Sequence, residues 1–297
     1  MGGRKPLLSA QARSYMAAMV TIVSWASAFP ATRYLLQYYS PGAIMLLRFL
    51  LAVLILVVIG FIKKIRLPKL KDMPLIVALG ISGVFLFNFF LNTGTINVVS
   101  GVSSFIVGTS PVFILILARI FLKEKVKPIC WVGVSISFCG LMGVTLSQTI
   151  GFSFNTGILL LVGAALSGSI LSITQRQLVK IYTTLEVTTY AIIVGTACML
   201  VYLPDILREF PGSPWQFNLA IVYMSIFPAV LAYLTWGYAL SKAEKTTHVT
   251  VFLYLIPFLA SLIGFVWLNE TFSLVSLLGG VLIVSGMVLT NVFGRSR

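Results

Sequence analysis

The sequence predicts an all-α integral membrane protein of ten transmembrane helices, arranged as two inverted five-helix repeats. Three observations lead to this fold class. The composition is too apolar for a surface that faces water, and apolar segments of spanning length recur along the whole chain. In addition, the second half repeats the residue spacing of the first half with the flanking charges exchanged.

The composition places the whole chain in a lipid bilayer. Of its 297 residues, 59% are hydrophobic and only 9% are charged, whereas an ordinary soluble domain is about 25% charged. The net charge of +14 does not predict a nucleic-acid partner, because the Lys and Arg residues bracket apolar runs and form no basic domain with interleaved aromatic residues. The three cysteines lie in apolar runs without a Cys-x-x-Cys pair, so we expect buried thiols and no metal site or redox cofactor.

Ten apolar segments follow one another along the chain, most of them about 17–25 residues long, which is the length that crosses a bilayer as an α-helix. Pro, Gly and charged residues separate them, as at Ser40-Pro41 and Lys127-Pro128. Several connections are so short that neighbouring helices should be antiparallel and in contact. The expected helices are, in order, 14–36, 42–62, 73–93, 97–121, 128–148, 155–175, 184–204, 216–240, 246–268 and 273–293.

The distribution of Lys and Arg predicts the orientation of these helices. With the N-terminus in the cytoplasm, most of the 21 Lys and Arg residues fall in the inside connections. The outside loops then hold Arg208 alone, with Arg33 near the outer end of the first helix. Both termini are therefore expected in the cytoplasm. The basic residues before the first segment resemble the start of a signal peptide, but the many segments after it favour an uncleaved first helix.

A fixed offset of 146 residues relates the stretch 94–145 to 240–291, and we interpret it as the sign of two repeats, 14–148 and 155–293. With five helices per repeat, the second repeat enters the membrane the other way up. The charges agree with this inversion, because the Lys-rich stretch at 123–127 corresponds to 269–273, which has no Lys. Inverted repeats around a site in the middle of the membrane are the architecture of alternating-access transporters. The corresponding residues are Pro111 and Pro257, Leu122 and Leu268, Glu124 and Glu270, Gly133 and Gly279, and Gly140 and Gly286.

Short motifs carry a family resemblance. The motifs are Trp25-Ala26-Ser27-Ala28-Phe29, Ser40-Pro41, Leu47-Arg48-Phe49, Ser110-Pro111-Val112-Phe113, Lys123-Glu124-Lys125, Ile256-Pro257 and Leu268-Asn269-Glu270. With them the chain resembles the EamA-type ten-helix branch of the drug/metabolite transporter superfamily over nearly its whole length. The resemblance implies a carrier of the inner or plasma membrane, often an exporter of amino acids or related metabolites. Its substrate would bind in a central cavity between the two halves.

Two departures from the family pattern narrow this expectation. Gly168-Ser169-Ile170-Leu171 stands where the first half has Trp25-Ala26-Ser27-Ala28, so an aromatic lining would come from one repeat only. The small four-helix multidrug relatives carry a membrane-embedded Glu in their first helix, and the stretch 15–36 has none. Proton-coupled export of cationic drugs is therefore disfavoured.

Ionisable residues inside the membrane are costly and are the first functional candidates. Arg48 lies within the second segment, where it either contacts substrate or has a structural role, by snorkelling or by bonding a carbonyl. Arg119 is expected to anchor at the lipid headgroups, and His248 is either interfacial structure or a proton relay. Glu124 and Glu270 lie at opposite faces, where helix capping is favoured over gating.

Polar and small residues offer further candidates. Asn88 and Asn92 are four residues apart and share one face of the third segment, so that face either lines a cavity or bonds another helix. A stripe of small residues normally indicates tight helix packing. If the stripe faces the inside of the helix bundle, it would instead leave space for a substrate. This stripe and its duplicate are Gly101, Ser104 and Gly108 in the fourth segment, and Thr247, Thr250 and Tyr254 in the ninth.

Aromatic residues and prolines complete the candidate set. Pro111, Pro228 and Pro257 lie inside expected helices and should kink them, either as static bends or as hinges during transport. Trp25, Tyr233 and Trp236 are the aromatic candidates for a cavity wall. The substrate-binding candidates are therefore Trp25, Arg48, Asn88, Asn92, Ser104, Gly108, Tyr233, Trp236, Thr250 and Tyr254.

These residues predict a secondary transporter that exports a small organic metabolite by alternating access around a central cavity. Amides, hydroxyls and aromatic rings without a fixed carboxylate suit a neutral, zwitterionic or anionic amino-acid-like solute, with facilitated or weakly proton-dependent transport. The expected partners are this solute and the lipid bilayer, with no cofactor; the oligomeric state stays open, a monomer included. The alternatives are a membrane-embedded lipid-handling enzyme, for which the chain shows no catalytic motif, and a non-transporting membrane subunit.

Overall fold

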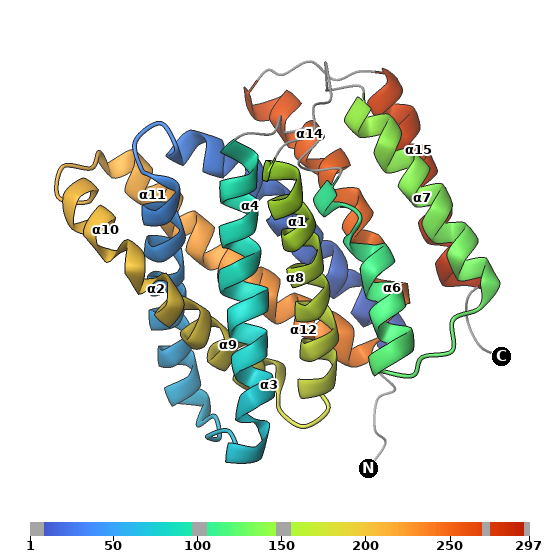
Figure 1. Ribbon diagram of the computed structural model, residues 1–297, viewed down its shortest axis with the longest axis horizontal. Helices are drawn as coiled ribbons and strands as arrows, with labels where there is room; N and C mark the ends of the chain where they lie inside the picture. The colour runs from blue at the N-terminus through green and yellow to red at the C-terminus, as the bar shows by residue number, and fades with distance from the viewer. Residues whose placement is uncertain (1–8, 97–105, 147–155, 269–273, 294–297) are drawn as a thin grey trace, which may run out of the picture.

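The computed structural model describes residues 9–96, 106–146, 156–268 and 274–293, and every regular element in these ranges is a helix (Figure 1). The all-helical prediction is therefore confirmed for this part of the chain. The first half contains α1 (Ala10–Leu35), α2 (Pro41–Lys63), η1 (Leu70–Asp72), α3 (Met73–Ala78), η2 (Leu79–Leu86), α4 (Phe87–Ile96), α6 (Ser110–Phe121) and α7 (Pro128–Leu146). The second half contains α8 (Thr156–Leu178), α9 (Thr184–Met199), η3 (Leu200–Tyr202), α10 (Leu203–Glu209), α11 (Trp215–Met224), η4 (Ser225–Leu231), α12 (Ala232–Lys242), α13 (Thr246–Thr250), η5 (Val251–Tyr254), α14 (Leu255–Leu268) and α15 (Leu274–Phe293).

Several of these elements join end to end into longer helical runs. Six runs within the described ranges are long and apolar enough to cross a bilayer, and shorter apolar helices accompany them. The six are Ala10–Thr32, Pro41–Lys63, Leu70–Gly94, Thr156–Leu178, Thr184–Glu209 and Trp215–Lys242. The shorter ones are Ser110–Phe121, Pro128–Gly143, Thr246–Ala260 and Leu277–Thr290.

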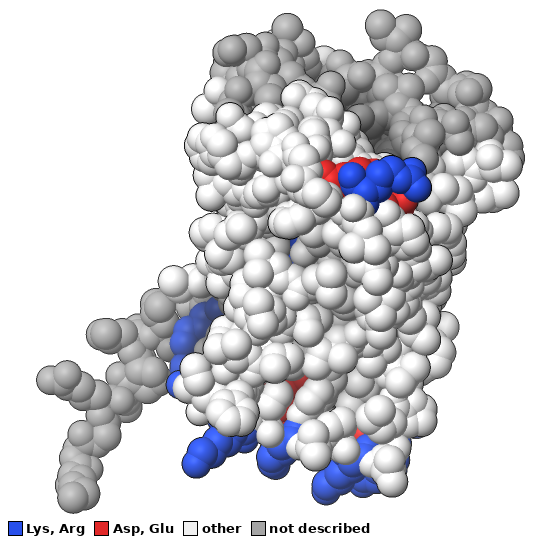
Figure 2. Space-filling model, turned by 90° about the vertical axis from the view of Figure 1, so that its left-hand side faces the viewer, with Lys and Arg blue, Asp and Glu red and all other residues white. Residues whose placement is uncertain are grey.

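The outer surface carries large apolar side chains. Leu54, Val201 and Leu207 are 60%, 69% and 68% exposed, which suits contact with lipid and not with water. On the face shown in Figure 2, Lys and Arg gather at one end of the molecule and a smaller charged group lies near the other end. The surface between these two ends carries almost no charge, as expected for the part of a membrane protein that meets hydrocarbon.

Hydroxyl side chains mark the starts of α1 and α2. The Ser9 hydroxyl accepts a hydrogen bond of 3.1 Å from the Ala12 N–H, and the Ser40 hydroxyl accepts one of 3.3 Å from the Ala43 N–H. Pro41 fits the first position of α2, because an N–H there would have no partner within the helix. The Ser40-Pro41 break in the sequence is thus the beginning of a helix.

Two helical runs contain π-helical segments. One is η2, between α3 and α4, and the other is η4, between α11 and α12. Pro228 lies inside η4, and Pro30, which the sequence reading did not single out, lies inside α1. π-Helical turns are rare and occur frequently at functional sites, so these two segments direct attention to the space between them.

The other two candidate prolines lie at helix starts and not in helix interiors. A turn at Gly108 and Thr109 precedes α6, so the expected helix 97–121 is interrupted, and Pro111 is the second residue of α6. Pro257 is the third residue of α14, directly after the 3₁₀ turn η5. A proline in the first turn sacrifices no helical hydrogen bond, which explains why these positions begin helices where the sequence suggested kinks.

Helices that are distant in sequence pack side by side. α1 contacts α12 and α14, α2 contacts α9, and α4 contacts α8. α7 and α15 form a separate pair at one side of the molecule (Figure 1). In this pair Gly133 faces Gly286 and Gly140 faces Gly279 so closely that a Cβ on Gly133, Gly140 or Gly286 would overlap the opposite backbone. The repeated glycines of the sequence therefore allow two helix backbones to touch.

Candidate functional site

A cavity of about 320 Å³ lies between helices from both halves of the chain. This volume is at the small end of the roughly 300–1,000 Å³ range of ligand pockets. The lining extends from Leu36, after the C-terminal end of α1, to Ser172 in α8 and Tyr233 in α12. Most of it is apolar, with a small number of amide, hydroxyl and guanidinium groups.

An aromatic cluster forms one wall of the cavity. The indole N–H of Trp25 donates a hydrogen bond of 3.2 Å to the Pro228 carbonyl, which fixes the ring against η4. The Trp25 ring meets the Tyr233 ring edge-on at 5.8 Å, and the Tyr233 hydroxyl lies 3.3 Å from the Gly83 carbonyl in η2. Trp236 lies behind this wall, fully buried, 5.5 Å from the Trp25 ring. The cluster is a rigid apolar surface held by both π-helical segments.

Arg48 and Asn88 bring the strongest polarity to the cavity. The Arg48 guanidinium donates a hydrogen bond of 3.3 Å from Nη2 to Oδ1 of Asn88. The Asn88 side chain is held in turn, because its amide nitrogen donates to the Val84 carbonyl at 2.7 Å. The guanidinium carbon also lies 4.6 Å from the centre of the Phe49 ring, a distance at which a cation is attracted to the ring face. Asn92 lines the cavity one turn further along α4.

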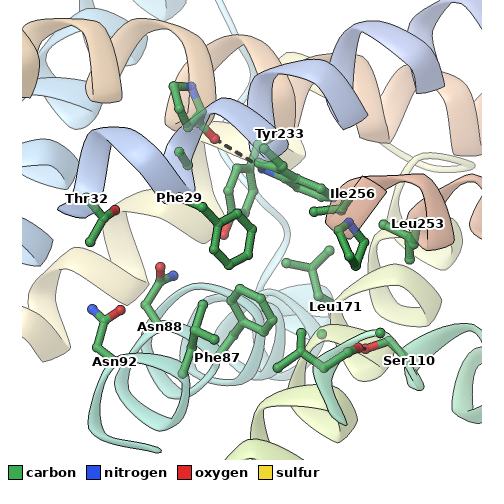
Figure 3. Close-up of a pocket in the computed structure, with 18 of the residues that line it drawn as sticks. Phe29, Thr32, Phe87, Asn88, Asn92, Ser110, Leu171, Tyr233, Leu253 and Ile256 are labelled. Atoms are coloured by element: carbon green, nitrogen blue, oxygen red, sulfur yellow. Dashed lines mark hydrogen bonds between the residues drawn. The ribbon is translucent and has the colours of Figure 1, made fainter. Parts of the chain in front are cut away.

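The polar and apolar residues are separated within the cavity. Figure 3 shows Phe29 and Phe87 near the centre of the view, with Thr32, Asn88 and Asn92 to one side of this pair. Leu171, Leu253 and Ile256 lie to the other side, together with Ser110. A solute in this space would have its polar groups at the amide end and its apolar part between the rings and the aliphatic side chains.

Both interrupted helices reach the cavity. Gly108 and Ser110 line it at the turn before α6, and Leu253, Ile256 and Pro257 line it at the junction between η5 and α14. The fixed offset in the sequence relates Pro111 of the first break to Pro257 of the second. Discontinuous helices that meet a cavity are a recurring feature of substrate sites in membrane carriers, because the free backbone groups there can face a solute.

The structure brings together six of the ten substrate-binding candidates. Trp25, Arg48, Asn88, Asn92, Gly108 and Tyr233 line the cavity, as do the candidate prolines Pro228 and Pro257. Trp236 lies outside the lining but donates from its indole N–H to the hydroxyl of Ser172, which does line it. Ser104 lies outside the described residues.

Thr250 and Tyr254 do not line the cavity. Both are almost fully buried, at 1% and 0% exposure. α13 packs on α6, and η5 packs on α6 and α7. Leu253, Ile256 and Pro257, spaced three and four residues apart, occupy the side of this run that faces the cavity. Gly108 lines the cavity and its duplicate Tyr254 does not, so these two corresponding positions are not equivalent.

Several lining residues were missed by the sequence reading. Phe29 and Thr32 follow Trp25 by four and seven residues, so the helical period already placed them on the Trp25 face of α1. Gly168 and Ser172 share one face of α8 in the same way. Phe87 and Leu171 had no signal of their own, because apolar residues in an apolar segment do not reveal which of them face a cavity.

Hydrogen bonds join α1 to α12 along the half of α1 that precedes the cavity. The Ser14 hydroxyl donates to the Ala239 carbonyl at 2.7 Å. About two turns further on, the hydroxyls of Thr21 and Thr235 are 2.7 Å apart. These bonds fix the first half of α1 against α12.

Charged residues make further contacts near the C-terminal end of α12. The Glu124 carboxylate accepts from the Thr246 N–H at 3.1 and 3.0 Å and from the Thr246 hydroxyl at 2.6 Å, so Glu124 caps α13, which confirms the capping role predicted for it. The Arg176 guanidinium donates to the carbonyl oxygens of Leu240 and Ala243 at the C-terminal end of α12. A cation at a helix C-terminus is favourable, so these contacts hold α6, α8, α12 and α13 together.

The chain is similar to known membrane transporters over nearly its whole length. The model of the EamA-like transporter family matches residues 12–146 and 155–292. An uncharacterized transporter of Bacillus subtilis (strain 168), YdfC, is 36% identical over 90% of this chain and 87% of its own. A probable terminal-alkyne amino-acid exporter of Streptantibioticus cattleyicolor is 30% identical over 96% of both chains. A solved crystal structure that is 21% identical has a TM-score of 0.80 and covers 95% of this chain and 97% of its own, which supports the fold alone.

Proposed function

The chain belongs to the EamA-like transporter family, and on that premise we propose that it moves a small amino-acid-like metabolite across the plasma membrane by alternating access. It is a multi-pass membrane protein, and its relatives are named as transporters and not as enzymes. A lipid-handling activity has no support from these relatives.

The proposed architecture has ten transmembrane helices in two inverted repeats, 14–148 and 155–293. The residue correspondence between the halves supports the duplication, and the loss of Lys at 269–273 supports the inversion. The packing of α7 on α15 adds to this, because Gly133 faces Gly286 and Gly140 faces Gly279. The offset pairs Gly133 with Gly279 and Gly140 with Gly286, so this contact is the one that a two-fold arrangement would produce.

One observation carries the mechanism: the cavity has walls from both halves, and the two halves are also joined by hydrogen bonds and a helix cap. Bonds of the kind between Ser14 and Ala239, or between Glu124 and Thr246, can break and re-form without unfolding a helix. The two breaks, at Gly108 and at η5, lie beside the cavity, where a change of angle between helix segments would widen one end and narrow the other.

The proposed solute is amino-acid-like, and the proposed direction is export. The cavity volume supports a solute of this size, and a relative of 30% identity is named as a probable amino-acid exporter. Among the described lining residues there is no Asp or Glu that could carry a proton with the solute. We therefore expect facilitated or weakly proton-dependent transport. The alternation of basic connections supports cytoplasmic termini.

Solute flux into proteoliposomes tests this function. Purified protein is reconstituted with and without a pH gradient, and the uptake of labelled apolar amino acids is followed. We expect saturable flux that changes little with the gradient. The Ala28→Trp variant should abolish it, because Ala28 lines the cavity and an indole there would fill the space. The matched control is Ala197→Trp, at an exposed position of α9.

The outcomes separate the alternatives. A non-transporting subunit would give no saturable flux with any of the amino acids. Strong accumulation driven by the pH gradient would contradict weak proton dependence. An equal effect of both tryptophan substitutions would show that the cavity is not the route.

A further inference from the structure

Arg48 is a cation with no anionic partner among the residues that the structure describes. Its side chain is half-buried and lines the cavity. Its polar partner is the neutral amide oxygen of Asn88, and its buried Nε makes no hydrogen bond. The described residues that line the cavity include no Asp or Glu. One amide and one ring face thus surround a charge that proteins normally pair with a carboxylate.

The contacts of Arg48 argue against a side chain that escapes to the membrane surface. Snorkelling requires the head group to extend along its own helix toward water. The guanidinium instead bonds Asn88 on α4, and that amide is oriented by the Val84 carbonyl. The head group is therefore held across the cavity between α2 and α4. A fixed guanidinium with free donors is suited to a planar anion such as a carboxylate, which it can bind through two parallel hydrogen bonds.

We propose that Arg48 binds the carboxylate of the carried solute and that the substrates are amino-acid-sized monocarboxylates with an apolar or aromatic side chain. This inference rests on the proposed transport function and names the substrate class of the same cavity. The carboxylate lies at the amide end, beside Asn88 and Asn92. The rest of the solute extends past Phe29 and Phe87 toward the aliphatic residues (Figure 3).

The same geometry sets the selectivity. A neutral amide in place of the carboxylate keeps the shape of the solute but loses the charge-assisted hydrogen bonds to Arg48. An amine without a carboxylate brings a second positive charge toward the guanidinium, and the described lining offers no carboxylate to neutralise it. The order of affinity is therefore carboxylate first, amide second and amine last.

Binding to the purified, detergent-solubilised protein tests the proposal. The probes are 3-phenylpropionate, 3-phenylpropionamide and phenethylamine, which have similar size and differ in charge. The dissociation constant of each is measured by titration and checked by ligand-induced thermal stabilisation. Wild-type protein should bind the carboxylate roughly 10- to 100-fold more tightly than the amide, as expected for a hydrogen-bonded charge pair.

Three variants assign this preference to one residue. Arg48→Gln should remove the preference for the carboxylate while leaving the affinity for the amide nearly unchanged. Arg48→Lys keeps the charge without the planar fork and should retain part of the preference. Arg119→Gln is the matched control, because Arg119 is exposed in the last turn of α6 and lies outside the cavity lining. The thermal midpoint without ligand shows whether each variant is folded. If Arg48→Gln does not fold, the comparison of wild type with Arg48→Lys decides whether the carboxylate preference depends on Arg48.

Several results would overturn the inference. These are equal affinity for carboxylate and amide in the wild type, a preference that survives in Arg48→Gln, or no binding of any of the three probes. Such failures leave the transporter assignment intact, because amino-acid flux in proteoliposomes does not depend on which group of the solute meets Arg48. Conversely, charge-selective binding without flux would support an anion site at Arg48 but contradict the proposed transport function.

Discussion

The indole N–H of Trp25 on α1 donates a hydrogen bond of 3.2 Å to the carbonyl oxygen of Pro228 in η4. The bond joins the first helix of the chain to the π-helical segment of the second half, directly at the cavity wall. It holds the indole ring against Tyr233 and Trp236. The aromatic wall is therefore positioned by a contact between the two halves and not by α1 alone.

Substitution of Trp25 by Phe should destabilise this wall. The substitution keeps an aromatic ring but removes the donor to Pro228, which should lower the free energy of unfolding by about 1 kcal/mol. Unfolding of the purified protein in mixed micelles measures the change. Trp131→Phe is the control, because Trp131 is 36% exposed on α7, away from the cavity. Equal losses in both variants would contradict the role assigned to the hydrogen bond.

The close approach of α7 and α15 makes a prediction about glycine. A Cβ on Gly286 would overlap the Gly133 carbonyl and the Ser137 side chain. We therefore expect Gly286→Ala to lower the free energy of unfolding by about 1–3 kcal/mol, the usual cost of overpacking. Gly143→Ala is the matched control in the same helix pair, because its Cβ would meet only the Gly279 Cα, at 3.8 Å. If the two alanine variants are equally stable, the contact does not depend on glycine.

The cap of α13 makes a third prediction. Glu124→Ala removes the acceptor for the N–H and hydroxyl of Thr246, so stability should fall by about 0.5–2 kcal/mol, as for other helix caps. The neighbouring Lys125→Ala, at an exposed position, should change stability little. Because this cap joins the two halves at the end that we propose to be cytoplasmic, the Glu124→Ala variant should be more reactive at that end in thiol or protease accessibility assays. Unchanged accessibility in the Glu124→Ala variant would show that the cap does not hold the two halves together at this end.

Much of this fold could be predicted from the sequence, because the bilayer imposes simple constraints on length and composition. Apolar segments located the helices, and Ser40-Pro41 marked the start of α2. The helical period placed Asn88 and Asn92 on one face, which does line the cavity. The sequence identified Arg48 as a charge within a membrane segment, but only the structure shows that its partner is the neutral amide of Asn88.

The remaining features depend on local departures from the α-helix, which composition does not reveal. Pro111 in an apolar run predicts a kink as readily as a helix start, and the structure shows the latter. The 3₁₀ turn η5 changes the helical register, so Thr250 and Tyr254 lie outside the lining while Leu253 and Ile256 lie within it. The π-helical segments η2 and η4 likewise have no sequence signature beyond Pro228.

The most direct test of the account is the accessibility of Ser172 from the two sides of the membrane. Ser172→Cys is made in a background with Cys130, Cys139 and Cys198 replaced by Ser, and vesicles of both orientations are treated with a membrane-impermeant thiol reagent. Ser285→Cys on α15, which is exposed but outside the cavity lining, is the control. Alternating access predicts that Cys at 172 reacts from both faces, in proportions that shift when a carried solute is added, while Cys at 285 does not respond. Reaction from one face only, with and without solute, would contradict the account.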